Sequence, residues 1–151
     1  MMKLILSSDH AGFHYKQALL VFLKEQGYEV TDGGPLSGDS VDYPHFIIPA
    51  AKRVASGEFE RGIVLGGSGN GEAMAANKVL GIRCAVVWNH DTARFAAQHN
   101  DANIISFGER VVSLETAKEA AMIWLTTPFE AGRHQRRIDQ LATYEQTGNI
   151  E

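Results

Sequence analysis

Short apolar runs alternate along the chain with longer stretches whose apolar residues recur at helical spacing. Residues 3–7 (KLILS) are the first such run, and residues 11–26 follow with apolar side chains three or four positions apart. The alternation continues along the chain, with glycine, proline or asparagine at many of the joints. The pattern predicts strands at residues 3–7, 28–31, 62–65, 83–88 and 103–107, and helices at residues 11–26, 44–56, 71–78, 91–99, 113–126 and from about 133 onward.

Alternating strands and helices are typical of a parallel sheet, and the composition of the strands supports this interpretation. They are apolar at consecutive positions, as in residues 62–65 (GIVL) and in the fourth strand, 83–88 (RCAVVW), which is predicted to be buried. We therefore expect an α/β fold with three layers, a doubly wound five-stranded parallel sheet with a further C-terminal helix. With its 151 residues, the whole chain 1–151 is predicted to be a single domain.

Composition excludes several classes of protein. Hydrophobic residues make up 44% and charged residues 21%, as in ordinary globular domains, and no apolar stretch is long enough to span a membrane. The net charge of -4 argues against nucleic acid as a partner. Cys84 is the single cysteine, so an internal disulfide is impossible, and its apolar strand predicts a packing role. These features, with an N-terminus unlike a signal peptide, predict a cytoplasmic protein.

A glycine-rich turn joins the third predicted strand to the third predicted helix. It spans residues 66–72 (GGSGNGE) and lies at the carboxyl end of a strand, where open parallel sheets bind their ligands. Backbone N–H groups in such a turn, together with the helix N-terminus, can form an anion site. A tight connection that needs positive φ would account for only one or two of the glycines. The turn is therefore the first candidate for a functional site.

The turn does not match the common nucleotide-binding motifs. A P-loop requires lysine and a hydroxyl residue after its last glycine, whereas Glu72 and Ala73 follow Gly71 here. The dinucleotide fingerprint fits Gly67 and Gly69 but has a small residue at the position of Glu72. A non-catalytic nucleotide-binding module remains an alternative from another class. Glu72 is either a first-turn acid that stabilises the helix or a general base whose environment lets it take and return a proton.

Other polar side chains are candidates for the same site. Asp9 and His10 follow the first strand, where Asp9 could also cap the next helix. His99 ends the fourth helix, a position at which surface histidines are also common. Arg133 and Arg137 lie four residues apart on one helical face, which suits a phosphate group or a solvated basic surface. His10 and His14 stand four residues apart and could share a metal, but no third ligand of suitable spacing accompanies them, so no metal is expected.

Six motifs, taken in order, resemble those of the ribose-5-phosphate isomerase B family, which also includes allose-6-phosphate and galactose-6-phosphate isomerases. The match extends from about residue 3 to residue 144 with family-like spacing. The resemblance implies a flavodoxin-like or Rossmann-like sheet and a homodimer or dimer of dimers with shared active sites. The motifs are SDHAG (8–12), VDYP (41–44), GGSGNGE (66–72), AANK (75–78), HNDAN (99–103) and GRH (132–134).

One position departs from the pattern of many family members, which carry a cysteine base where Gly66 stands in this chain. The chain instead matches the branch with GGSGNGE at the turn, in which the glutamate is the base. The resemblance thus implies a cofactor-free aldose–ketose isomerase of the pentose phosphate pathway, with Glu72 as its base. It would interconvert D-ribose 5-phosphate and D-ribulose 5-phosphate through a cis-enediolate. An isomerase of a six-carbon sugar phosphate, allose 6-phosphate or galactose 6-phosphate, is the alternative.

The resemblance also implies a role for each candidate residue. His99, assisted by Asp9, would open the furanose ring, and Glu72 would move the proton from C2 to C1. The remaining residues are expected to bind the substrate: Ser68 as a catalytic donor, with the N–H groups of Gly67, Gly69, Asn70 and Gly71, at the enediolate oxygen; His10, Arg110, Arg133 and Arg137 at the phosphate; and Asn100 at the sugar hydroxyls.

Overall fold

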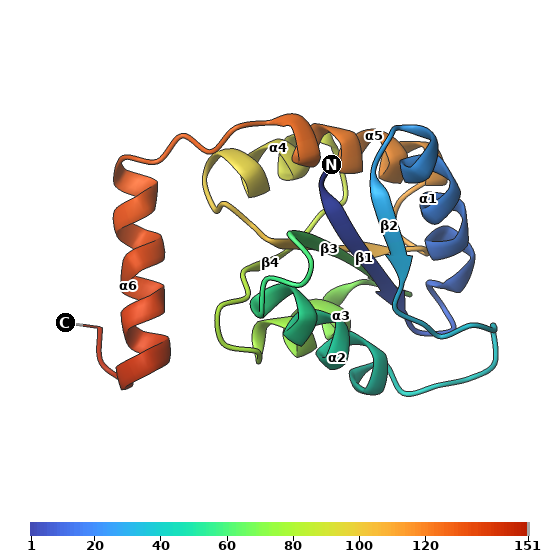
Figure 1. Cartoon of the computed structure of the whole chain (residues 1–151), viewed down its shortest axis with the longest axis horizontal. Coiled ribbons are helices and arrows are strands. Elements are labelled where there is room, and N and C mark those ends of the chain that lie inside the picture. Colours follow the sequence, from blue (N-terminus) through green and yellow to red (C-terminus); the bar gives the residue numbers. More distant parts are fainter. Residues whose placement is uncertain (151) are drawn as a thin grey trace.

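A sheet of five parallel strands lies at the centre of the computed structural model, which describes residues 1–150 (Figure 1). Helices connect the successive strands, as parallel neighbours require. The predicted elements are present, and most of their ends lie within two residues of the predicted ones. The elements are β1 (Lys3–Ser8), α1 (Phe13–Glu25), β2 (Glu29–Asp32), α2 (Pro44–Ala55), β3 (Arg61–Gly66), α3 (Asn70–Asn77), β4 (Cys84–Val86), α4 (His90–Gln98), β5 (Ile104–Gly108), α5 (Leu114–Thr126) and α6 (Arg133–Thr147).

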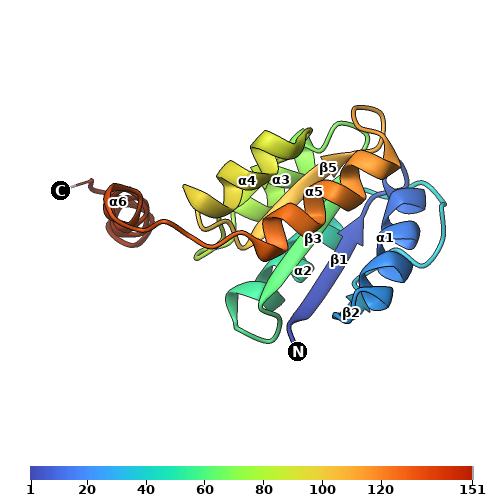
Figure 2. The same ribbon diagram turned by 90° about the horizontal axis from the view of Figure 1, so that it is seen from above.

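Helices cover both faces of the sheet (Figure 2). On one face α1, α4 and α5 pack over β1, β3 and β5, with Leu19 and Trp124 fully buried. On the other face α2 and α3 pack over the same strands, with Ile47 fully buried. Because every central strand contacts apolar side chains on both sides, its residues are apolar at consecutive positions. The predicted α/β class and the three-layer, doubly wound arrangement are confirmed.

The strand order is β2-β1-β3-β5-β4, so the last two strands are exchanged relative to the flavodoxin order 2-1-3-4-5. As a result β4 lies at the edge of the sheet and contains only three residues, each half-buried. The prediction of a buried strand over residues 83–88 is therefore wrong in length and in burial. An apolar run shows that a strand contacts helices, but it does not show whether a second strand pairs with it.

A buried lysine holds the start of the loop between β2 and α2. Lys16 on α1 is fully buried, and its Nζ donates hydrogen bonds to Asp32 Oδ1 and to the carbonyl oxygen of Pro35, both at 2.6 Å. Ser7 Oγ, also buried, donates to the carbonyl oxygen of Gly34 at 3.1 Å. Polar groups buried in this way need such partners, because an unpaired one would be costly. The loop therefore leaves the sheet in a fixed direction.

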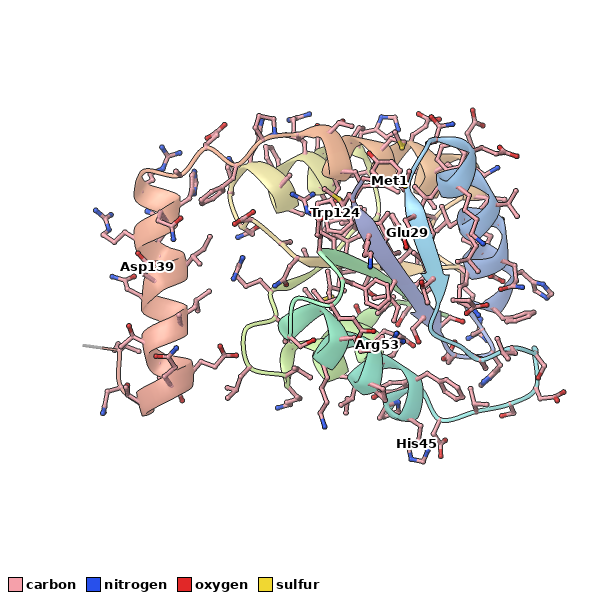
Figure 3. The ribbon with its side chains drawn as sticks, viewed as in Figure 1. Met1, Glu29, His45, Arg53, Trp124 and Asp139 are labelled. Carbon is pink, nitrogen blue, oxygen red and sulfur yellow. The ribbon has the colours of Figure 1, made fainter. Side chains whose placement is uncertain are left out.

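The last helix, α6, stands away from the α/β body beyond the edge strand β4 (Figures 1 and 2). Figure 3 shows the contrast between Trp124, which lies among core side chains, and Asp139, which lies on this outlying helix. A groove of about 620 Å³ separates α6 from residues 81–85. Leu141 and Tyr144, which line this groove, are 62% and 56% exposed. Across residues 1–150, no helix has the length and apolar character needed to cross a membrane.

Candidate active site

The carboxyl ends of β1, β3 and β5 meet at one edge of the sheet and bring candidate residues together there. The backbone N–H of Asp9 donates to the carbonyl oxygen of Leu65 at 3.2 Å, which ties the end of β1 to that of β3. The backbone N–H of Arg110 donates to the carbonyl oxygen of Gly67 at 3.0 Å and ties the end of β5 to the glycine-rich turn. Asp9, the turn and Arg110 therefore form one continuous surface.

Glu72 lies in the first turn of α3 and is only 3% exposed. Its carboxylate folds back over the α-carbon of Gly66, in the space that a Cβ at residue 66 would occupy. Burial raises the pKa of Glu72 above its ordinary range, and the neighbouring Asp9 carboxylate raises it further, while a backbone N–H opposes the shift. A buried carboxylate of this kind can accept a proton from a substrate carbon and return it.

Asp9 reaches Glu72 from the turn after β1. Its Oδ1 also accepts a hydrogen bond from the backbone N–H of Gly12 at 3.0 Å, which fixes the carboxylate at the entrance to α1. Gly12 itself packs so tightly on the backbone of Leu65 and Gly66 that a Cβ there would overlap it. The close approach of α1 to β3 thus brings the two carboxylates together.

The turn itself presents donors next to Glu72. Gly69 adopts φ +85°, a left-handed conformation that suits glycine, and directs the chain into α3. The backbone N–H of Asn70 donates to Ser68 Oγ at 3.2 Å, so that amide already has a partner. The hydroxyl hydrogen of Ser68 remains able to donate to an oxyanion. The ring of Tyr43 lies against the α-carbon of Gly71 and closes one side of the turn.

Two further side chains on this edge carry positive charge or can donate protons. The guanidinium of Arg110 lies against Gly67, where an added Cβ would come within 3.1 Å of it. His10 Nδ1 accepts a hydrogen bond from the backbone N–H of Val41 at 3.2 Å. A neutral His10 ring must therefore carry its hydrogen on Nε2, the nitrogen that remains able to donate to an anion.

The other candidates lie at the opposite ends of the strands, where the strands begin. His99 caps the end of α4, and Asn100 follows it, shortly before β5 begins. Arg83, which immediately precedes β4, donates from its side chain to the carbonyl oxygens of Asn100 and Asp101 at 3.0 and 2.7 Å. Since β3 contains six residues and a strand rises about 3.3 Å per residue, roughly 16–20 Å separates the two edges. Within the chain, His99 and Asn100 therefore do not meet Glu72.

Arg133 and Arg137 lie on the exposed face of α6, as the helical spacing predicts. The start of α6 lies beside His99, because His134 stacks on its ring with centroids 4.3 Å apart. These arginines are therefore on the side of His99 rather than on the side of Glu72. The structure divides the sequence-predicted residues into two half-sites, one at each edge of the sheet.

His99, Glu130 and His134 have nitrogen and carboxylate oxygen atoms within 4.8 Å of one another, as metal ligands would. The two imidazole rings are stacked with centroids 4.3 Å apart and planes 12° apart, so their in-plane nitrogen lone pairs lie in two nearly parallel planes. A tetrahedral ion needs ligands that converge on one point, and the stack would have to break to provide them. The arrangement fits ring stacking better than metal binding.

Sequence reasoning missed the residues that support the half-site around Glu72. Tyr43 belongs to the VDYP motif but received no role there, and Lys16 has the same appearance as any helical lysine. Glu109 Oε1 accepts the backbone N–H of Tyr15 at 2.9 Å and so satisfies a donor in the first turn of α1.

The thiol of Cys84 is not activated for chemistry, since burial raises its pKa to about 12.

Comparison with known proteins finds sugar-phosphate isomerases over nearly the whole chain. The family described as Ribose/Galactose Isomerase matches residues 4–141. Ribose-5-phosphate isomerase B of Mycolicibacterium paratuberculosis is 48% identical, with 97% of this chain and 93% of that protein aligned. The structure of ribose-5-phosphate isomerase B of Clostridium thermocellum has a TM-score of 0.96 at 46% identity and covers 98% of this chain and 100% of its own. The Mycoplasma genitalium enzyme with bound ribulose-5-phosphate has a TM-score of 0.94 at 36% identity, with 97% of each chain covered.

Proposed function

The chain belongs to the ribose/galactose isomerase family, and we propose that Glu72 is the base with which it interconverts ribose 5-phosphate and ribulose 5-phosphate. The observation that carries this assignment is the buried Glu72 carboxylate, which lies beside the donors of the turn and has a raised pKa. Such a group suits the proton transfer of an aldose–ketose isomerisation, because it must act alternately as base and acid.

The reaction follows from these positions. In the open-chain aldose, Glu72 removes the proton from C2, and the electrons of that bond move into the carbonyl group and leave a cis-enediolate with its charge on O1. The Ser68 hydroxyl and the free N–H groups of the turn stabilise this oxygen, each donor contributing about 3 kcal/mol in comparable sites. Protonated Glu72 then delivers the proton to C1, while the hydroxyl proton moves from O2 to the O1 oxyanion as the C2 carbonyl forms.

We propose that two copies of the chain share each active site, in a homodimer or dimer of dimers. Glu72, Asp9, His10 and Arg110 of one protomer would meet the partner's His99, which opens the sugar ring. The separation of the two half-sites supports this arrangement, and so do the exposed apolar side chains of Leu141 and Tyr144 on α6. The distribution of cationic groups supports it too, because Arg110 and His10 lie at the Glu72 edge whereas Arg133 and Arg137 lie on the side of His99. The residues supplied by the partner would be His99, Asn100, Arg133 and Arg137.

We also propose that the enzyme works in the cytoplasm. Cys84 is a free thiol, which suits a reducing compartment.

The substrate is tested by steady-state assays on three sugar phosphates. We expect kcat/KM for ribose 5-phosphate to exceed that for allose 6-phosphate and galactose 6-phosphate by at least about 10-fold, because one extra carbon must be accommodated in the pocket. A higher value for either six-carbon sugar would contradict the pentose assignment. Calorimetry with NAD and ATP provides the comparison for a nucleotide-binding module: binding of either one without isomerase activity would overturn the proposal.

The pH profile tests the coupling between Glu72 and Asp9. Activity should fall as the pH decreases through the pKa of Glu72, because the protonated carboxyl cannot accept the C2 proton. In Asp9→Asn the neighbouring negative charge is gone, so the pKa of Glu72 decreases and the acidic limb of kcat/KM moves to lower pH. The amide oxygen still accepts the Gly12 N–H, which preserves the turn.

The matched control for this profile is Asp91→Asn, which removes an exposed acid at the carboxyl edge after β4. Its acidic limb should coincide with that of the unmodified enzyme. A limb that stays in place in Asp9→Asn, or moves to higher pH, would show that Asp9 does not raise the pKa of Glu72.

A further inference from the structure

The imidazole of His99 is stacked between two other rings. Its centroid lies 4.9 Å from that of Phe95 and 4.3 Å from that of His134, with an interplanar angle of 12° in each case. Two rings that are both parallel to a third at these distances cannot overlap the same face, so they lie on opposite faces. Phe95 comes from the preceding turn of α4, whereas His134 comes from the first turn of α6. The orientation of His99 therefore depends on two separate elements.

The backbone is strained on both sides of this stack. Asp101 and Ala131 have φ values of 42° and 58°, and they are the only non-glycine residues with positive φ within the part of the chain that the structure describes. Asp101 follows His99 by two residues, and Ala131 precedes His134 by three. Such conformations cost on the order of 1–3 kcal/mol each and persist where the surroundings impose them, most often at functional sites. The strained backbone at Asp101 is close to His99 in the chain, and the strained backbone at Ala131 leads to His134, so each helps to fix the position of one histidine in the stack.

The side chain of His134 is buried but makes no hydrogen bond within the described residues 1–150. Its side chain is 9% exposed, and its Nε2 has no hydrogen-bond partner, since the nearest carboxylate oxygen, Glu130 Oε2, is 3.8 Å away. Burial lowers the pKa of His134, and the charge of Arg133 lowers it further, so the ring is neutral at neutral pH. A neutral ring can stack on a protonated His99 without electrostatic repulsion.

We propose that His134 is a positioning residue that holds the imidazole of His99 against Phe95 in the orientation needed to open the sugar ring. The proposal rests on the proposed function, in which His99 donates a proton to the ring oxygen of ribose 5-phosphate. This role also links the ring-opening residue His99 to the proposed phosphate ligand Arg133, because His134 lies next to Arg133 in α6. Movement of α6 would then displace the ring-opening acid and the phosphate ligand together.

Two reactions of the same enzyme separate ring opening from proton transfer. Ribose 5-phosphate is mainly a furanose, so its isomerisation requires ring opening. Ribulose 5-phosphate cannot form a furanose, because its C5 oxygen carries the phosphate, so exchange of its C1 proton with deuterium oxide needs only Glu72. In His134→Ala, we expect kcat/KM for ribose 5-phosphate to fall about 10- to 100-fold while the C1 exchange rate stays within about twofold of the unmodified enzyme.

Companion variants keep the test independent of folding defects. His134→Phe retains a flat ring in the stack and should restore ribose 5-phosphate turnover. Phe95→Ala removes the ring on the other face, at a side chain that is 40% exposed, and should reproduce the selective loss. Gln135→Ala, an exposed neighbour on α6, should change neither reaction.

An equal loss in both reactions, or unchanged ribose 5-phosphate turnover in His134→Ala, would overturn the positioning role. Failure of His134→Phe to restore turnover would also count against stacking as the cause. Absence of both reactions in the unmodified enzyme would instead contradict the proposed function, so the two failures are distinguishable.

Discussion

Replacement of Glu72 by glutamine should lower kcat for ribose 5-phosphate by about 10²–10⁴-fold, the usual contribution of a general acid–base group. Glutamine has nearly the size of glutamate and fits the space over Gly66, but it cannot accept the C2 proton. KM should change little, because the proposed phosphate and hydroxyl ligands remain. Exchange of the C1 proton of ribulose 5-phosphate should be lost to the same extent, since both reactions use the same base.

The same substitution should not destabilise the protein at neutral pH. The pKa of Glu72 is raised in the folded state, so its stabilising contribution is complete below the unfolded-state pKa and is lost as the pH increases through the folded-state pKa. Above its folded-state pKa, the native carboxylate is a buried charge that folding disfavours, whereas glutamine is neutral at every pH. Chemical denaturation at pH 7 should show Glu72→Gln to be at least as stable as the unmodified enzyme, with any advantage shrinking toward pH 4.

Glu115→Gln is the matched control, because Glu115 is also an acid in the first turn of a helix but is exposed. It should retain full activity. Activity close to normal in Glu72→Gln would remove Glu72 from the role of base, and a large loss of stability would show that its carboxylate is mainly structural.

The sequence predicts most of the fold because each strand and helix is specified locally. Ser113, for example, is a residue type that favours the N-cap position, and its Oγ accepts the Thr116 N–H at 3.1 Å at the start of α5. The position of β4 could not be predicted in this way. Whether β4 or β5 pairs with β3 depends on tertiary packing, which leaves no mark on the apolar run at residues 83–88.

The glycine-rich turn and Glu72 are visible in the sequence because glycine spacing and a helix-initial acid are local features. The structure adds the reason for Gly66: the Glu72 carboxylate occupies the space of its missing side chain. A cysteine at residue 66 and a glutamate at residue 72 would therefore compete for the same place. This exclusion accounts for the departure of the chain from the cysteine-containing pattern.

Spatial relations between distant segments are the part that the sequence does not reveal. His99 and Glu72 are both recognisable by motif, yet neither motif shows which residues of other segments surround it. The contact between His134 and His99 is equally hidden, because it depends on the path of residues 127–132 and on the strained backbone at Ala131. These relations decide whether one protomer can form a complete site.

The separation of the half-sites leads to a test by complementation. If each active site combines Glu72 of one protomer with the partner's His99, Glu72→Gln and His99→Asn damage different halves of a site. A heterodimer of the two variants then contains one site with both defects and one site with neither. If each site instead lay within a single protomer, every site of the heterodimer would carry one defect.

Heterodimers purified through two different affinity tags should therefore regain about half of the normal activity per dimer, although each parent variant is nearly inactive. The control pairs Glu72→Gln with Arg110→Ala, because both residues lie at the carboxyl edge of one protomer. In that heterodimer each site keeps one defect, so activity should not exceed the sum of the parent proteins. Recovery in the control pair, or none in the Glu72→Gln and His99→Asn pair, would contradict shared sites. The measurement thus distinguishes a site divided between two chains from a site that lies within a single chain.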